Sequence, residues 1–156
     1  MLSQTTEYAL RAMMLLATLE AGISVNSETI AAQTQVPQGY LSKILRDLVV
    51  AELIDSQRGP NGGFSLARDA AKISMLDVVN AVDPIERIHE CPLNNPAHLN
   101  RCPLPQRIDN AINAIETQFR STTLAEIRDA GPAPIAPCGR LTVSAAARSK
   151  KHPDKG

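Results

Sequence analysis

The chain lacks a net charge, because its 16 basic residues are balanced by 16 acidic ones. Proteins that bind nucleic acids usually carry an excess of positive charge, so the overall composition counts mildly against DNA binding. Any attraction to phosphate must therefore come from a local cluster of basic side chains. The candidates in the N-terminal part are Lys43, Arg46, Arg58, Arg68 and Lys72.

The chain also lacks a long apolar run. Residues 12–19 are largely apolar, but Glu7 and Arg11 lie at the start of this segment and Glu20 closes it. The segment is too short and too interrupted for a signal peptide or a membrane span. We therefore expect a cytoplasmic protein that does not enter a membrane. Three cysteines, an odd number without an export signal, indicate reduced thiols and no disulfide framework.

Motifs for catalysis are lacking as well. No serine, cysteine or carboxylate lies in a recognisable nucleophile or phosphate-binding motif. His89 and His98 lie in a proline-rich stretch without an evident third catalytic partner. We therefore do not expect an enzyme.

What the sequence has is an ordered series of helix and strand signals. An amphipathic helix that Thr5 or Thr6 caps comes first, followed by a short helix over 29–33 that Ser27 opens, and by a third helix over 38–52 that begins after Pro37. Strand-like segments at 53–57 and 63–67 flank a turn rich in Gly and Pro, and Ser74 caps a helix over 75–81. This order predicts a mostly α winged helix-turn-helix domain with a small β-wing, covering residues 1–83.

The third predicted helix has two distinct faces. Leu41, Ile44, Leu45, Leu48 and Val49 recur with helical spacing and form a stripe that we expect to be buried. The outward face carries short, polar or cationic side chains that can reach phosphates and base edges. These candidate DNA-binding residues are Gln38, Gly39, Tyr40, Ser42, Lys43 and Arg46.

Residues 84–104 form an irregular segment with potential metal ligands. Cys91 and Cys102 are each followed by proline, and His98 lies between them. Thiolates and imidazoles bind iron, iron–sulfur clusters or zinc. These three residues supply at most three of the four ligands usually required, so a fourth must come from elsewhere. Alternatively, the cysteines pack as small hydrophobic residues and the histidines lie on the surface.

The last part of the chain predicts a long helix and a tail. Over residues 105–130, apolar residues are spaced for a seam, with a possible break at 121–123. One small domain cannot easily bury such a helix, so we expect a homodimer whose two-fold axis sets two recognition helices against two half-sites. Residues 131–156 are rich in proline and alanine and end in a basic run, and we expect them to be disordered.

Taken together, four motifs resemble the winged-helix repressor family that includes IscR, NsrR and CymR. They are the opening segment 2–11, the pair Tyr40-Leu41, the turn from Arg58 to Phe64, and the cysteine loop before a long helix that contains Thr122-Thr123-Leu124. The resemblance covers about residues 1–129. It implies a homodimer whose third helix enters the major groove of a double-stranded operator, while the wing, at Arg58 and the adjoining Gly59, reaches the minor groove.

The same resemblance implies a metal site. Cluster-binding relatives carry three cysteines in this loop and draw a further ligand from the rest of the dimer, in some cases an acidic residue in the first helix of the other subunit. Cys91 and Cys102 match the outer two cysteines, Glu7 occupies the acidic position, and the middle cysteine is missing. With His98 as a substitute, the set of Cys91, Cys102, His98 and Glu7 favours a two-iron (2Fe–2S) over a four-iron cluster.

The resulting prediction is a transcriptional repressor whose DNA affinity is switched by an iron–sulfur cluster that senses redox state, nitric oxide or iron supply. A second possibility keeps the repressor but makes Cys91 and Cys102 a metal-free switch that oxidises reversibly to a disulfide. A third is a regulatory partner that binds an enzyme through the long helix, which the neutral net charge alone supports.

Overall fold

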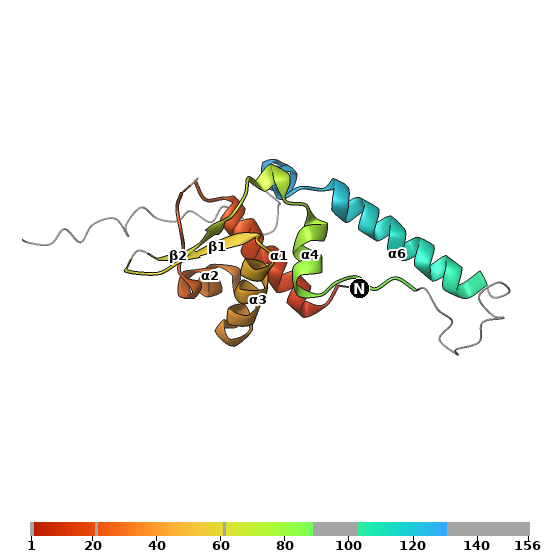
Figure 1. The fold of residues 1–156 in the computed structure, drawn as a ribbon, viewed down its shortest axis with the longest axis horizontal. Coiled ribbons are helices and arrows are strands. Elements are labelled where there is room, and N and C mark those ends of the chain that lie inside the picture. The colour runs from red at the N-terminus through yellow and green to blue at the C-terminus, as the bar shows by residue number, and fades with distance from the viewer. Residues whose placement is uncertain (1, 21, 61, 89–102, 131–156) are drawn as a thin grey trace, which may run out of the picture.

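The computed structural model describes residues 2–20, 22–60, 62–88 and 103–130, and it is mostly helical with one two-stranded sheet (Figure 1). In chain order the elements are α1 (Gln4–Ala17), α2 (Ser27–Thr34), α3 (Gln38–Val50), β1 (Ile54–Gln57), β2 (Gly63–Leu66), the 3₁₀ helix η1 (Ala70–Lys72), α4 (Met75–Val82), α6 (Pro103–Ser121) and α7 (Leu124–Asp129). The predicted fold class, a mostly α winged helix-turn-helix with a small β-wing, is confirmed.

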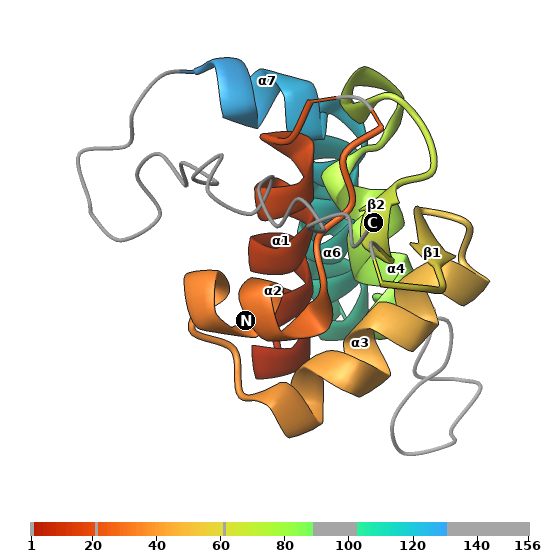
Figure 2. The ribbon, with the colours of Figure 1, turned by 90° about the vertical axis from the view of Figure 1, so that its left-hand side faces the viewer.

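Helix α1 is the centre of the hydrophobic core. Its buried residues include Ala9, Ala12, Met13 and Leu16, and the helix packs against α2, α3, α4 and α7. Figure 2 shows α1 upright in the middle of the domain, with α3 below it and α7 above. The cap at its start is Ser3, whose Oγ accepts a hydrogen bond from the Thr6 N–H at 3.2 Å, and not the predicted Thr5 or Thr6.

Two further helix starts follow from side-chain caps. Ser74 caps α4 as predicted, and it forms a reciprocal capping box with Asp77. Helix α2 begins slightly earlier than predicted, because Asn26 provides its cap and accepts a hydrogen bond from the Thr29 N–H at 2.8 Å. Asn and Ser are about equally good at this position, so the sequence signal did not separate Asn26 from Ser27.

The connection from α3 to the wing depends on a strained residue. The predicted helix reached Glu52, but α3 ends at Val50, and Glu52 adopts a left-handed conformation with φ 56°. The Glu52 N–H donates to the Val49 carbonyl and the Leu53 N–H donates to the Leu48 carbonyl, both at 3.0 Å. This is the hydrogen-bond pattern of a Schellman motif, which usually has glycine at the left-handed position.

Replacing Glu52 with glycine is therefore expected to raise the free energy of unfolding by up to about 1 kcal/mol. A left-handed conformation costs a side-chain-bearing residue about 1–2 kcal/mol, and part of that gain is offset by the greater entropy of glycine in the unfolded chain. Urea unfolding followed by circular dichroism measures the difference. Val50→Gly is the matched control, because Val50 is the last residue of α3 and is not left-handed, so glycine there should destabilise the protein. A destabilised Glu52→Gly variant would contradict the assignment of strain.

The wing is an antiparallel hairpin in which Ile54 pairs with Leu66 and Gln57 pairs with Gly63. Gly63 lies directly against the chain that precedes α2, and a Cβ atom there would come within 2.6 Å of the Val25 backbone. The Val25 N–H donates to the Phe64 carbonyl at 3.0 Å, and the Phe64 N–H donates to the Val25 carbonyl at 2.8 Å. Glycine at this position therefore allows the wing to join the segment that precedes α2.

The long C-terminal helix of the prediction is two helices, and the break falls at the expected place. The chain leaves α6 at Ser121 and forms an antiparallel bridge between Thr123 and Ser74. The Leu124 N–H donates to the Ile73 carbonyl at 2.9 Å, and Leu124 is fully buried in the core. The division of the chain at residues 83, 104 and 130 stays a prediction, but the core includes Leu124 and Ala125 from α7.

Helix α6 projects well beyond the packed domain in Figure 1. None of its residues is buried, and α4 is its main neighbour within the described part of the chain. Among the described helices, none has the length and apolar character to cross a membrane.

Candidate nucleic-acid interface

Helix α3 presents the face that its sequence pattern predicted. Leu41, Ile44, Leu45 and Leu48 are buried, and Val49 is half-buried against the core. All the predicted outward residues are exposed: Gln38, Gly39, Tyr40, Ser42, Lys43 and Arg46. The helix therefore anchors itself through one stripe and leaves a polar stripe with two cations facing solvent.

A tight turn sets α3 relative to α2. Gln35 adopts a left-handed conformation with φ 57°, and the Val36 N–H donates to the Ala31 carbonyl at 3.2 Å. Val36 is buried, which fixes the turn to the core, and Pro37 occupies the position just before the first residue of α3. This turn makes α3 follow α2 directly, which is the order that a helix-turn-helix with a recognition helix requires.

The wing carries an exposed cation at its turn. Arg58 and Gly59 are both exposed at the start of the turn between β1 and β2. Gly59 has φ 115°, a conformation that glycine adopts without strain, and its carbonyl accepts a hydrogen bond from the Gly62 N–H at 2.9 Å. The predicted unusual backbone angle in the wing is thus present at Gly59.

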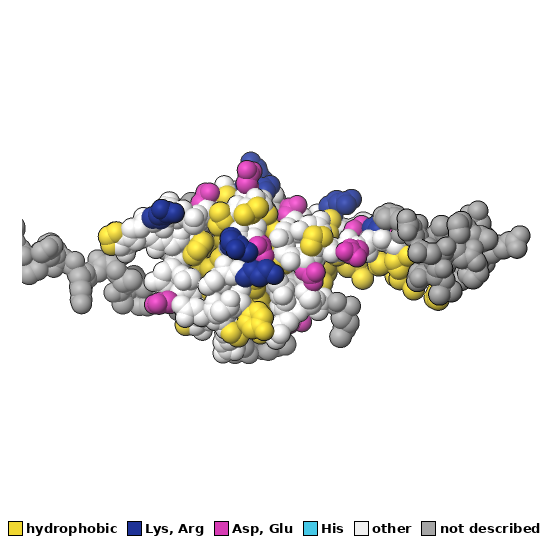
Figure 3. Space-filling view, turned by 60° about the horizontal axis from the view of Figure 1, so that its bottom comes forward, with side chains coloured by type: hydrophobic (Ala, Val, Ile, Leu, Met, Phe, Trp, Pro, Cys, Tyr) yellow, Lys and Arg dark blue, Asp and Glu magenta, His cyan; other side chains and the backbone are white. Residues whose placement is uncertain are grey.

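The basic side chains of this face are dispersed. Figure 3 shows the side of the molecule on which α3 lies, and its Lys and Arg side chains form small separate groups, with acidic groups between some of them. Arg46 illustrates this, because its Nε lies 3.8 Å from a carboxylate oxygen of Asp47. Of the other predicted cations, Arg68 donates through Nε to the Glu52 carbonyl at 3.3 Å, and Lys72 is exposed in η1. Any attraction to phosphate is local.

An aromatic contact joins the start of α1 to the start of α3, and sequence reasoning missed it. The rings of Tyr8 and Tyr40 meet edge to face with their centroids 6.2 Å apart. The Arg11 guanidinium lies 5.8 Å from the Tyr8 ring centroid, within the range of a cation–π interaction. Tyr8 belongs to the apolar periodicity of α1, which by itself assigns it to the core, so no local signal paired it with Tyr40.

Of the predicted metal ligands, only Glu7 lies among the described residues. Its side chain is 55% exposed in the first turn of α1, with a carboxylate oxygen 3.9 Å from an Arg11 nitrogen. Cys91, His98 and Cys102 lie outside the described residues, so their predicted geometry stays a prediction. In the described part of the chain, no three Asp, Glu, His or Cys residues are grouped to hold a metal ion. The Glu7 carboxylate is thus exposed, and its side-chain contact is the long ion pair with Arg11, which a metal ion would have to replace.

Arg87 ties α6 to the chain just before the segment that contains Cys91, His98 and Cys102, here called the cysteine segment. Its guanidinium donates to both carboxylate oxygens of Asp109, at 2.6 and 2.7 Å, and to Glu116 and Asn113 at 3.2 and 3.1 Å. The Ile88 N–H also donates to Asp109 at 3.2 Å. The hydrogen bond to Asp109, with the nearby carboxylate charges, raises the pKa of Arg87 above its usual value. The acceptors recur at helical spacing, but nothing in the sequence pairs them with Arg87.

Helix α6 exposes large apolar side chains. Leu104, Ile108 and Ile115 are 62%, 41% and 48% exposed, and Ile112 and Phe119 are half-buried. Their spacing places all five on one stripe of the helix. In Figure 3 a row of hydrophobic side chains runs along one edge of the projecting helix. Exposed apolar stripes of this kind mark interaction surfaces.

Comparison with known proteins agrees with this geometry. Residues 2–130 match the family model Rrf2, described as an iron-dependent transcriptional regulator. The Mycobacterium tuberculosis (strain H37Rv) protein named "Putative HTH-type transcriptional regulator Rv1287" is 32% identical over 128 residues, which is 81% of this chain and 80% of that protein.

Solved structures give the same fold. CymR, the global cysteine regulator of B. subtilis, has a TM-score of 0.70 at 23% identity and covers 84% of this chain and 98% of its own. IscR of T. potens has a TM-score of 0.68 at 25% identity, covering 87% and 92%. The chain therefore belongs to the Rrf2 family, and it is a DNA-binding transcriptional regulator and not an enzyme.

Proposed function

We propose that the protein is a cytoplasmic, homodimeric repressor that binds a double-stranded operator through α3 and the wing. The observation that carries this proposal is the exposed polar stripe of α3, together with the exposed Arg58 and Gly59 at the turn of the wing, whose strand β1 packs against α3. In this arrangement Gln38, Ser42, Lys43 and Arg46 face the major groove, and Gly39 and Tyr40 lie where the helix enters it. Arg58 reaches the minor groove beside them.

The dimer is proposed to form through α6. The stripe that contains Leu104, Ile108 and Ile115 has no partner among the described residues that buries it. Burying a side chain of this type is worth about 1.5–3 kcal/mol, and a two-fold axis doubles the number of side chains buried. Two copies paired along α6 would set two α3 helices against two operator half-sites.

The signal is proposed to enter through the cysteine segment. Cys91, His98 and Cys102 would bind an iron–sulfur cluster of the two-iron type together with Glu7 of the other subunit. When bound, the cluster would supply sensitivity to redox state, nitric oxide or iron supply. The description of the matched family as iron-dependent supports this part, and so does the accessibility of Glu7.

Two sets of contacts among the described residues support a route by which that segment would act on DNA binding. Arg87 attaches the preceding chain to α6, so a displacement of the segment would act directly on α6. Tyr8, next to Glu7, contacts Tyr40 at the start of the recognition helix. A change of about 1–3 kcal/mol in coupling is enough for an effective switch.

Purification without oxygen tests the cluster. We expect near-stoichiometric iron with a matching amount of acid-labile sulfide, in the proportion of a two-iron cluster. Such a cluster needs few ligands beyond the two thiolates. Cys91→Ala and Cys102→Ala should each abolish iron binding. Cys138→Ala is the matched control and should retain it, since that cysteine belongs to the C-terminal tail. Unchanged iron content in Cys91→Ala would remove this ligand set.

The second candidate is a metal-free thiol switch. It is favoured by one specific observation, the presence of only two cysteines where the cluster-binding relatives carry three. Absence of both iron and sulfide after attempted reconstitution would support it. Oxidation should then form a Cys91–Cys102 disulfide, detectable by mass spectrometry, and change the DNA affinity reversibly.

A further inference from the structure

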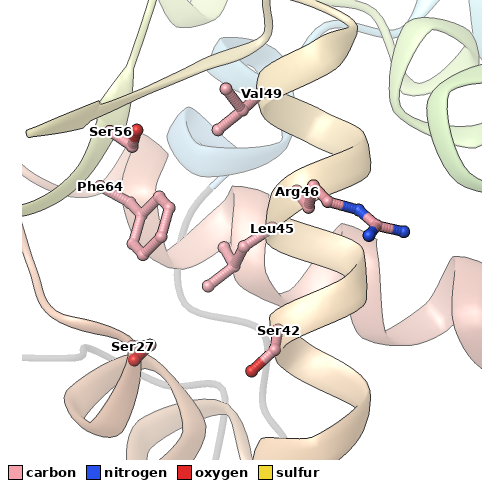
Figure 4. Close-up of a pocket in the computed structure, with 7 residues that line it drawn as sticks. All are labelled: Ser27, Ser42, Leu45, Arg46, Val49, Ser56 and Phe64. Carbon is pink, nitrogen blue, oxygen red and sulfur yellow. The ribbon is translucent and has the colours of Figure 1, made fainter.

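A cavity of about 310 Å³ lies between α2, α3 and the wing (Figure 4). Its lining comes from four elements: Ser27 begins α2, Ser42, Leu45, Arg46 and Val49 lie along α3, and Ser56 and Phe64 are opposite each other on β1 and β2. A volume near the lower end of the 300–1,000 Å³ found for small-molecule sites suits one compact group, and not an extended ligand.

The cavity combines an apolar wall with uncharged donors. Leu45, Val49 and the ring of Phe64 form the wall, and the hydroxyl groups of Ser27, Ser42 and Ser56 lie around it. Figure 4 shows the Arg46 guanidinium directed away from the cavity, so this residue contributes its aliphatic stem. Ser42 donates to the Gln38 carbonyl at 3.2 Å, a long hydrogen bond that a better acceptor can replace.

The position of the cavity indicates which part of a DNA duplex would occupy it. Its two sides are the recognition helix and the wing, which the proposed function places in adjacent grooves of one duplex. A strand of the DNA backbone separates adjacent grooves, so it must cross the space between these elements. A deoxyribose has an apolar surface that fits the wall, and its phosphate accepts hydrogen bonds from serine hydroxyls.

We infer that this cavity holds one deoxyribose-phosphate unit of the operator strand that passes between α3 and the wing. The hydroxyls of Ser27, Ser42 and Ser56 donate to the phosphate oxygens, and Leu45, Val49 and Phe64 contact the sugar. This inference rests on the proposed function, because it presumes that α3 and the wing bind the same duplex. It adds an uncharged contact that fixes the register of the protein on DNA without reading a base.

The test uses the full-length protein and a duplex selected by the wild-type protein from a random library. The triple variant Ser27→Ala, Ser42→Ala, Ser56→Ala should bind that duplex about tenfold or more weakly, since hydrogen bonds to a charged acceptor are lost. The salt dependence of its affinity should equal that of the wild type, because no cation is removed. Arg58→Gln, by contrast, should lower the slope of log K against log[salt] by about 0.9.

A scan with single methylphosphonate linkages locates the contact. One neutral linkage should weaken binding of the wild type but cause no further loss in the triple-serine variant, because both changes remove the same interaction. Ser65→Ala is the matched control, since Ser65 lies on β2 next to Phe64 and points to the other face of the wing. Ser42→Leu fills the cavity with a good helix former, and it should weaken binding more than Ser42→Ala does.

Two results would overturn the inference while the proposed function stands. One is a triple-serine variant that melts like the wild type and binds within about twofold of it, which is the usual error of such comparisons. The other is a triple-serine variant whose loss of affinity adds to the loss caused by a methylphosphonate at every position of the scan. Failure of the wild type to select any duplex would instead overturn the proposed function, and this inference with it.

Discussion

Replacing Leu124 with alanine is expected to destabilise the protein by about 2–5 kcal/mol, as truncation of fully buried leucines does in well-packed cores. Leu124 has no exposed surface, although it and its neighbour Ala125 lie more than forty residues beyond the other buried residues of the core. Its N–H also donates to the Ile73 carbonyl. Urea unfolding followed by circular dichroism measures the loss, and the transition should remain a single step because α7 belongs to the same core as α1.

Ile127→Ala is the matched control for this prediction. Ile127 is an apolar residue of the same helix but is only half-buried, so its truncation should cost clearly less. Equal effects of the two substitutions would contradict the packing described for α7. A Leu124→Ala variant as stable as the wild type would mean that α7 does not contribute to the core in solution.

The double substitution Ile108→Glu and Ile115→Glu is expected to convert the proposed dimer into a monomer. The two residues lie on the exposed stripe of α6, and two-fold pairing would bring four buried carboxylates into an apolar interface. Sedimentation equilibrium over a range of protein concentrations measures the change in mass. DNA affinity should fall by at least about tenfold, because a monomer engages only one half-site at a time.

Asn110→Glu provides the control. Asn110 is exposed on the same helix but lies on the side opposite the stripe, so an added carboxylate there should leave the mass of the dimer unchanged. If the Ile108 and Ile115 double variant remained a dimer, α6 would not be the dimer interface. If both variants dissociated, general repulsion and not loss of the stripe would account for the result.

Local signals were sufficient for much of the domain. Helical spacing predicted which residues of α3 are buried and which are exposed. Apolar residues that recur every 3.6 positions lie on one side of a helix, and that side packs against the core. Ser74 was predicted as the cap of α4 because its hydrogen bonds stay within one turn. The glycines of the wing predicted its turn, since Gly59 adopts an angle that other residues avoid.

Other features arise from contacts between distant parts of the chain. The cavity joins residues of α2, α3 and both wing strands, and no spacing in the sequence indicates that Ser27, Ser56 and Phe64 meet. The ties of Arg87 to α6 and of Tyr8 to Tyr40 are of the same kind. The left-handed conformation of Glu52 was missed because the burial of Leu53 and its hydrogen bond to the Leu48 carbonyl outweigh the local preference against it.

The sequence by itself therefore determined the order of the elements, the two faces of α3 and the turn of the wing, because each depends on interactions within a few residues. Only the tertiary structure decided that α7 completes the core, that Arg87 ties the chain before the cysteine segment to α6, and that a cavity separates α3 from the wing. These features depend on packing between residues far apart in the chain, where geometry and not periodicity selects the partner.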